Sequence, residues 1–243
     1  MENIKFTIAV ATYNSAQPII ELFESIYHQT YQNYEVVIID GLSNDNTMDI
    51  VKQWLRPSDK LISEKDSGVY DAMNKALDLA TGDFLIFMGS DDHFLSYRIL
   101  SDVANSIKQI GGDMNTIYYG GCYMERYRNV LNKIQTKWSW VRGTMCHQCI
   151  FYPKSVYKNY KYNLRYKINA DYAYNLSLWG KIKFQHIDVI ISFFSDGGLS
   201  GENRYDIPFR KDLPSMLKER CGYMPYLYKL LRLFMGRLFK GRP

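Results

Sequence analysis

The alternation of short apolar strands with helical segments over the first 110 residues limits this chain to few folds. Strand-length apolar runs cover residues 7–11, 35–40, 60–63 and 83–88, and helical periodicity follows Pro18, spans 47–55 and spans 70–77. We expect Asp66 or Ser67 to cap the third helix and Gly82 to end it. Because strands that alternate with helices build parallel sheets with right-handed crossovers, we predict an α/β fold with a mostly parallel sheet flanked by helices.

Length and composition fit one large α/β domain or two small ones and exclude a disordered chain. Of the 243 residues, 47% are hydrophobic and 23% are charged, and no apolar run reaches the ~20 residues that cross a bilayer. The amino terminus lacks the basic start and long apolar centre of a secretory signal, so we expect a cytoplasmic protein.

The four cysteines are too few and too scattered for a disulfide framework. Cys146 and Cys149 form a C-x-x-C pair, but Cys122 and Cys221 are isolated in sequence and do not complete a zinc motif. We interpret the pair as reduced thiols in or near the core, with metal or redox use as the alternative.

Polar side chains come directly after each predicted strand, where ligands bind in sheets of this kind. They are Thr12, Tyr13 and Asn14 after the first strand, Asp40 at the end of the second, Asp66 after the third, and Asp91 and Asp92 after the fourth. Carboxylates gathered at one sheet edge repel each other and favour a cation among them. The adjacent Asp91 and Asp92 offer the hard oxygen ligands that Mg²⁺ or Mn²⁺ prefers; alternatively, one of them caps a helix expected near Tyr97. The chain has neither of the glycine-rich phosphate-binding loops, so a bound diphosphate would require a metal ion.

Four segments in this order resemble the family 2 glycosyltransferases. They are Ala11-Thr12-Tyr13-Asn14, the stretch 39–47, the stretch 67–76 that contains Gly-Val-Tyr-Asp-Ala-Met-Asn-Lys, and Ser90-Asp91-Asp92. The third is similar to enzymes of colanic-acid and other bacterial exopolysaccharide pathways. The resemblance implies a GT-A (Rossmann-like) fold, a nucleotide-sugar donor with UDP favoured, Mn²⁺ or Mg²⁺, inversion at the anomeric carbon, and a glycan or lipid-linked acceptor.

The same resemblance implies roles for individual residues on the donor side. Thr12 and Tyr13 would lie against the base, with Asn14 beside them, and Asp40 would hydrogen-bond the base. Asp66 and Asn74 would line the donor pocket. Asp91 would lie near the ribose and diphosphate and share the metal with Asp92. Gly41 and Gly89 stand where family members often carry an acid. A non-catalytic relative that binds nucleotide sugars or glycans is therefore the alternative.

A transfer with inversion also needs a base for the acceptor hydroxyl. Asp171 precedes an amphipathic pattern and could simply cap a helix, but a lone Asp at this place matches the family's general base. His147 is the rival base, because histidine changes charge closest to neutral pH. The segment Gly197–Gly201 has the composition either of a lid over the donor or of a plain turn.

We expect three parts in the chain: residues 1–110 as the nucleotide-sugar-binding half, 111–204 as the acceptor-binding half, and 205–243 as a basic amphipathic helical tail. From Phe209 onward there are nine Lys and Arg against two acids. Helical spacing over 225–240 places Leu227, Leu230, Leu231, Phe234 and Leu238 opposite Lys229, Arg232, Arg237 and Lys240. This pattern is typical of a helix at an anionic membrane surface, here the inner face of the plasma membrane. Docking on the domain or on a second subunit is the alternative, and no nucleic-acid partner is expected.

Overall fold

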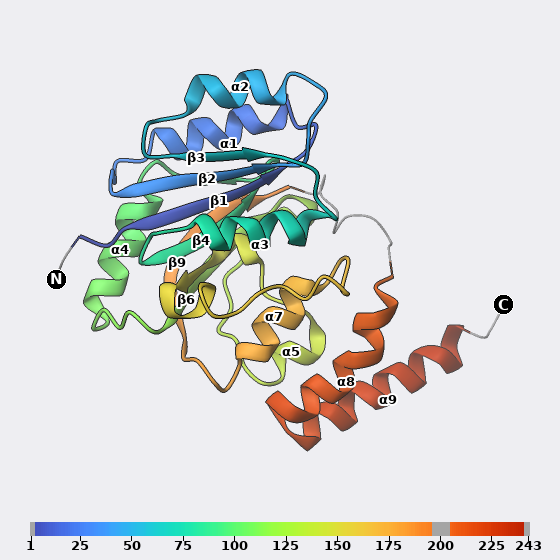
Figure 1. The fold of residues 1–243 in the computed structure, drawn as a ribbon. Helices are drawn as coiled ribbons and strands as arrows, with labels where there is room; N and C mark the ends of the chain where they lie inside the picture. The colour runs from blue at the N-terminus through green and yellow to red at the C-terminus, as the bar shows by residue number, and fades with distance from the viewer. Residues whose placement is uncertain (1–2, 196–204, 241–243) are drawn as a thin grey trace.

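The structure is a computed structural model that describes residues 3–195 and 205–240, with side chains through residue 233. Nine strands form a mixed sheet in the order β3-β2-β1-β4-β8-β6-β9-β5, with β7 added to β6, and helices cover the sheet (Figure 1). The strands are β1 Phe6–Thr12, β2 Tyr34–Asp40, β3 Lys60–Ser63, β4 Phe84–Gly89, β5 His93–Phe94, β6 Ile117–Met124, β7 Asn129–Leu131, β8 Ile150–Pro153 and β9 Phe184–Phe194. The α-helices are α1 Pro18–Tyr27, α2 Thr47–Trp54, α3 Val69–Leu79, α4 Ile99–Gln109, α5 Ser139–Arg142, α6 Lys154–Tyr157, α7 Ala170–Leu178, α8 Ile207–Cys221 and α9 Tyr223–Lys240, with 3₁₀ turns η1 Glu125–Tyr127 and η2 His147–Cys149.

The predicted parallel arrangement is confirmed for the strands of the first 110 residues that build the centre of the sheet. β3, β2, β1 and β4 are parallel neighbours, and their register pairs Thr12 with Asp40 and Asp40 with Ser63. The carboxyl ends of these strands therefore meet at one edge. Beyond β4 the sheet is mixed, because β8 runs antiparallel to both β4 and β6, whereas β6 and β9 are parallel.

Two apolar cores, one on each face of the sheet, explain why the first strands are continuous apolar runs. In β1, Phe6, Ile8 and Val10 pack in one core with α1 and α4, whereas Ala9 packs in the other core with α3 and α7. Both faces of these strands are covered by helices, as is usual for parallel strands (Figure 1).

Two expectations for the third helix are wrong. α3 begins at Val69 after Gly68, whose φ of 124° favours glycine, and the cap position makes no side-chain hydrogen bond. The helix ends at Leu79, before Gly82. A Cβ at Gly82 would lie 2.7 Å from the backbone nitrogen of Thr7, so this glycine permits close approach to β1 rather than ending the helix.

The helix that carries Asp171 is not amphipathic as expected. All residues of α7 are buried except Ser177, because the helix is enclosed between the sheet and α8. Burial on every side is possible since most of its side chains are apolar or aromatic.

The helix predicted over 225–240 lies within α9, and Lys229 from its predicted basic side contacts the domain. Lys229 is half-buried and donates a hydrogen bond from Nζ to the carbonyl oxygen of Val141 at 3.2 Å. Leu227, Leu230 and Leu231 are exposed, so the leucine stripe does not cover the domain. The side chains of Phe234, Arg237, Leu238 and Lys240 and the segment Gly197–Gly201 lie outside the described residues.

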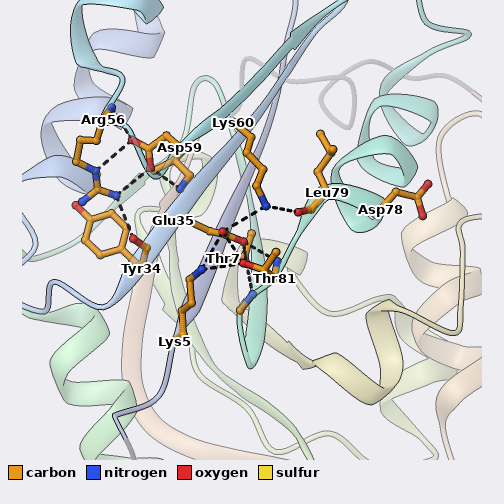
Figure 2. A network of polar contacts seen from close by, with 12 residues as sticks. Lys5, Thr7, Tyr34, Glu35, Arg56, Asp59, Lys60, Asp78, Leu79 and Thr81 are labelled. Atoms are coloured by element: carbon orange, nitrogen blue, oxygen red, sulfur yellow. Dashed lines mark hydrogen bonds and ion pairs between the residues drawn. The ribbon is translucent and has the colours of Figure 1, made fainter.

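A polar network joins the amino-terminal ends of the central strands (Figure 2). The carboxylate of Glu35 accepts hydrogen bonds from Thr7, Thr81 and Lys5 and lies 3.5 Å from Nζ of Lys60. Burial alone would raise the pKa of Glu35, but the hydrogen bonds from Thr81, Thr7 and Lys5 outweigh burial and lower the pKa to about 2. The edge opposite the strand carboxyl ends is thus fixed by charge and hydrogen bonding.

Candidate active site

A cavity of about 740 Å³ lies beyond the carboxyl ends of the central strands. Its wall combines the β1–α1 loop, the start of α3, the end of β4, the η2 turn and the end of β9. Among the predicted site residues, the wall contains Thr12, Tyr13, Asp66, Asp91, Asp92 and His147. A cavity of this size accommodates a ligand as large as a nucleotide sugar.

Asp92 is the most enclosed acid on the cavity wall. Its carboxylate accepts hydrogen bonds from the backbone nitrogens of Gly89 and Ser195, each at 3.1 Å, and from Nε2 of Gln148 at 2.6 Å. Burial, followed by the charge of Asp91, raises the pKa of Asp92 to about 6, and burial also raises the pKa of Asp91. Two adjacent carboxylates with raised pKa values form a site whose ionised state a cation would stabilise.

The alternative that Asp91 or Asp92 caps the following helix is wrong. α4 begins at Ile99, with Arg98 at the cap position. A Cβ at Gly89 would lie 2.6 Å from Oδ2 of Asp92 and 3.0 Å from Oδ1 of Asp91. The missing side chain at position 89 therefore leaves the space that these two carboxylates fill.

Thr12 and Tyr13 contribute one wall of the cavity from the end of β1. The ring of Tyr13 is 60% exposed and available for stacking. Oγ1 of Thr12 is buried and has no hydrogen-bond partner within residues 3–195 and 205–233. A buried hydroxyl without a partner is costly, which favours a ligand that supplies one.

Asp66 reaches the same part of the cavity from the loop before α3. Its Oδ1 accepts a hydrogen bond from the backbone nitrogen of Gly68 at 2.9 Å. Its Oδ2 lies 2.8 Å from where a Cβ at Gly41 would stand. The carboxylate of Asp66 thus occupies the space beside Gly41.

Three predicted donor-binding residues do not line the cavity. Asp40 is fully buried and accepts hydrogen bonds from Ser43 and Ser63, so it orders the loop after β2. Oδ1 of Asn14 accepts from the backbone nitrogen of Asn44 at 2.9 Å, which joins the β1 and β2 loops.

Asn74, predicted to line the donor pocket, lies in α3 and is not part of the described cavity wall. Its amide donates to the carbonyl oxygen of Tyr162 at 3.0 Å and accepts from the nitrogen of Tyr162 at 2.8 Å. These paired bonds satisfy the amide and hold the segment before α7 against α3.

The two candidate bases lie next to each other. Nδ1 of His147 is 3.7 Å from Oδ2 of Asp171, and the hydroxyl of Tyr70 is 2.8 Å from Oδ1 of the same carboxylate. Burial and then the charge of Asp171 raise the pKa of Tyr70, so its hydroxyl stays protonated. Asp171 is the second residue of α7, whose cap position makes no side-chain hydrogen bond, and His147 rather than Asp171 lines the cavity.

Several residues at this wall were not predicted from the sequence. Tyr70 positions Asp171, and Lys167 and Ser195 complete the lining. Tyr70 lies inside the recognised 67–76 segment, but nothing in the sequence indicates that α7 comes to lie against it. Ser195 reaches Asp92 because β9 pairs with β5, the strand that directly follows Asp92.

The family model described as "Glycosyl transferase family 2" matches residues 7–175. The chain belongs to glycosyltransferase family 2. This span carries the acids on the cavity wall and both candidate bases, so the family match and the cavity concern the same residues.

Two similar glycosyltransferases cover different shares of this family 2 glycosyltransferase. A PGL/p-HBAD biosynthesis glycosyltransferase of Mycobacterium bovis is 32% identical over 227 residues, which cover 86% of this chain and 84% of that protein. The Escherichia coli UDP-Glc:alpha-D-GlcNAc-diphosphoundecaprenol beta-1,3-glucosyltransferase WfaP is 32% identical over 49% of this chain and 47% of its own.

Solved structures show that the glycosyltransferase has the GT-A fold. Staphylococcus aureus TarS 1–349 in complex with UDP-GlcNAc gives a TM-score of 0.73 at 20% identity, covering 89% of this chain and 66% of that chain. In a longer TarS structure the match spans only 37% of that chain. The Pyrobaculum calidifontis mannosyltransferase PcManGT in complex with GDP-Man and Mn²⁺ gives a TM-score of 0.61 at 16% identity. The match covers 98% of this chain and 81% of that chain.

Within residues 3–195 and 205–240, no helix combines sufficient length with sufficient apolar character to span a membrane.

Proposed function

We propose that this glycosyltransferase moves a sugar, with inversion, from a nucleotide-diphosphate sugar to a hydroxyl of a glycan or lipid-linked acceptor in surface-polysaccharide biosynthesis. One observation carries the proposal: Asp91, Asp92 and His147 all lie on the cavity wall. Asp171 lies beside His147, with 3.7 Å between its Oδ2 and Nδ1 of the imidazole. Acids for a cation and a candidate base in one cavity are what displacement of a nucleoside diphosphate by a hydroxyl requires. UDP is the favoured nucleotide, since TarS is solved with UDP-GlcNAc.

The residues on the cavity wall fit a divalent metal. Asp92, with Asp91 beside it, would hold Mn²⁺ or Mg²⁺, because both offer carboxylate oxygens and both have pKa values raised by burial. When bound, the ion would supply positive charge for the departing diphosphate. Tyr13 would stack on the base, Thr12 would offer its unpartnered hydroxyl, and Asp66 would bind the donor.

We assign the general base to Asp171, and His147 is the second candidate because it lines the cavity. The hydroxyl of Tyr70 donates to one carboxylate oxygen of Asp171 and leaves the other directed at the imidazole. This arrangement orients the carboxylate, so Tyr70 is a positioning residue. Asp171 must accept a proton from the acceptor hydroxyl within hydrogen-bond reach when the acceptor is bound.

We further propose that three parts of the chain have different roles. Residues 1–110 bind the donor, residues 111–204 build the acceptor side, and residues 205–243 form a tail that contacts an anionic membrane. The exposed leucines of α9 support the membrane contact, because an apolar helix face left uncovered by the domain is available to lipid. A membrane contact would bring the cavity close to a lipid-linked acceptor.

The experiment for the transfer reaction is a panel of nucleotide sugars incubated with the protein and Mn²⁺ or Mg²⁺. We expect release of nucleoside diphosphate with one donor, and its loss in Asp92→Ala. Asp102→Ala is the matched control, since Asp102 is a surface acid of α4 paired with Arg98 and should retain activity. No release with any donor and a panel of glycan acceptors would support a non-catalytic binding protein instead.

A further inference from the structure

Three cysteines from distant parts of the sequence come together beside the cavity. Cys122 lies in β6, Cys146 directly precedes the η2 turn, and Cys149 is the last residue of that turn. Their sulfur atoms all lie within 4.8 Å of one another. The sequence spacing does not reveal this cluster, because Cys122 reaches the C-x-x-C pair only through the pairing of β6 with β8, which directly follows η2.

We propose that Cys122, Cys146 and Cys149 bind a thiophilic d¹⁰ cation, with Zn²⁺ as the physiological ion. Three sulfurs bound at ~2.3 Å to a tetrahedral Zn²⁺ lie ~3.8 Å apart, so the cluster needs to contract only by up to about 1 Å. Binding forms three Zn–S bonds and releases the thiol protons to solvent. This site is separate from the carboxylate pair, because thiolates select Zn²⁺ whereas carboxylates select Mn²⁺ or Mg²⁺.

The surroundings of the cluster suit a bound cation. Cys122 and Cys146 line a second cavity of about 290 Å³, which gives an ion a route from solvent and room for a water as a fourth ligand. Lys133 and Arg142 lie on the wall of that cavity and would offset the negative charge of three thiolates around a divalent ion. Oγ of Ser192 lies 3.2 Å from Sγ of Cys149 and can donate a hydrogen bond to that sulfur.

The cluster lies where a bound cation would hold the η2 turn in place. Cys146 and Cys149 enclose His147 and Gln148, and both of these lie on the wall of the donor cavity. Nε2 of Gln148 donates a hydrogen bond to Oδ2 of Asp92 at 2.6 Å, so the turn between the two cysteines also contacts the acid pair. A cation bound to the flanking sulfurs would fix the η2 turn and so position His147 and Gln148.

Titration of the reduced full-length protein with Cd²⁺, in degassed buffer with a phosphine reductant, tests the proposal. We expect about one ion per chain and a sulfur-to-metal charge-transfer band. Cys146→Ser and Cys149→Ser should weaken binding by more than about tenfold. Cys221→Ser is the matched control, because Cys221 lies in α8 away from the cluster, and it should bind as the wild type does. Asp92→Ala should also keep the band, which separates this site from the donor site.

The wild-type protein also provides a test that does not depend on the folding of variants. Zn²⁺ should raise the thermal unfolding midpoint and remain bound after dialysis, as measured by elemental mass spectrometry. Absence of both the charge-transfer band and the Zn²⁺-dependent shift would overturn the proposal. Variants of Cys146 and Cys149 that bind Cd²⁺ as tightly as the wild type would also overturn it.

Discussion

Asp92 on the cavity wall combines three hydrogen-bond donors around its carboxylate with a raised pKa. Two backbone nitrogens and Gln148 donate to its carboxylate, yet burial and the neighbouring charge of Asp91 still raise its pKa to about 6. The donors come from β4, η2 and the end of β9, so a single carboxylate joins three segments of the chain.

The first prediction concerns the pH dependence of metal binding. A carboxyl group whose pKa is raised keeps its proton up to about pH 6, and the proton competes with the cation. The affinity for Mn²⁺ should therefore be full above about pH 7 and fall steadily as the pH drops through 6. Calorimetric titration of Mn²⁺ with UDP present, at several pH values, measures this. An affinity that stays constant down to pH 5 would exclude Asp92 as a ligand.

The second prediction separates the two candidate bases. Asp171→Asn should lower the transfer rate by ~10²–10⁴-fold while the dissociation constant of the donor stays the same. His147→Gln should retain much more of the rate if Asp171 is the base, and Tyr70→Phe should lower the rate less than Asp171→Asn. Rates of product formation under saturating donor measure this, and the assignment to Asp171 fails if Asp171→Asn transfers at the wild-type rate.

The third prediction concerns stacking by Tyr13. Tyr13→Ala should weaken UDP binding by ~1–3 kcal/mol, the contribution of one base–aromatic stack. Tyr13→Phe is the control, because it keeps the ring and should bind UDP nearly as the wild type does. Equal affinity in all three proteins would show that the ring does not contact the base.

At the scale of elements, the connections between strands and helices carry the tightest packing constraints. The segment between α3 and β4 passes so close to β1 that a side chain at Gly82 would meet both the backbone nitrogen and Oγ1 of Thr7 at 2.7 Å. The backbone nitrogen of Gly82 also donates to Oγ1 of Thr7, so this contact joins the connection to the central strand.

The fourth prediction follows from this close approach. Gly82→Ala should lower the free energy of unfolding by ~1–3 kcal/mol, because the added methyl group cannot fit without displacing β1. Gly143→Ala is the matched control: a Cβ at Gly143 meets nothing within 4 Å, and its φ of 176° is extended. We expect the control to change stability by less than ~0.5 kcal/mol. Urea unfolding measures both, and equal stability of the two variants would contradict the argument.

At the scale of the whole molecule, the two edges of the central sheet differ in what lies against them. The amino-terminal edge is held by the Glu35 network (Figure 2). The carboxyl-terminal edge borders the cavity. The pair of helices α8 and α9 lies at the periphery beside α5 and α7 (Figure 1). Lys229 attaches α9 to the domain, and Leu227, Leu230 and Leu231 remain exposed.

The fifth prediction concerns the carboxyl-terminal helix. A chain that ends at Met224 should lose binding to vesicles with anionic lipid, while release of nucleoside diphosphate stays largely intact. Leu231→Asp is the second variant, because this exposed leucine can be changed without disturbing the contact of Lys229. Vesicle sedimentation measures both, and unchanged binding of both variants would remove the membrane from the proposal.

The sequence by itself determined the strands of the central sheet and the acids at their ends, because continuous apolar runs and turn residues are local signals. Asp66, Asp91 and Asp92 were all predicted from their place after a strand. The ends of α3, by contrast, were predicted wrongly. Gly68 is suited to its positive φ and Gly82 to its close approach to β1, and neither requirement is visible in the pattern of apolar residues.

Only the tertiary structure decided which of these residues share the cavity. Asn74 and Asp40 match family motifs, but Asn74 is hydrogen-bonded to Tyr162, and Asp40 to Ser43 and Ser63, and neither side chain lines the cavity. The contact of His147 with Asp171 and the approach of Cys122 to Cys146 each join residues that are 24 positions apart in the sequence. Sequence patterns report neighbours along the chain, whereas contacts between distant segments depend on how the sheet and the helices pack.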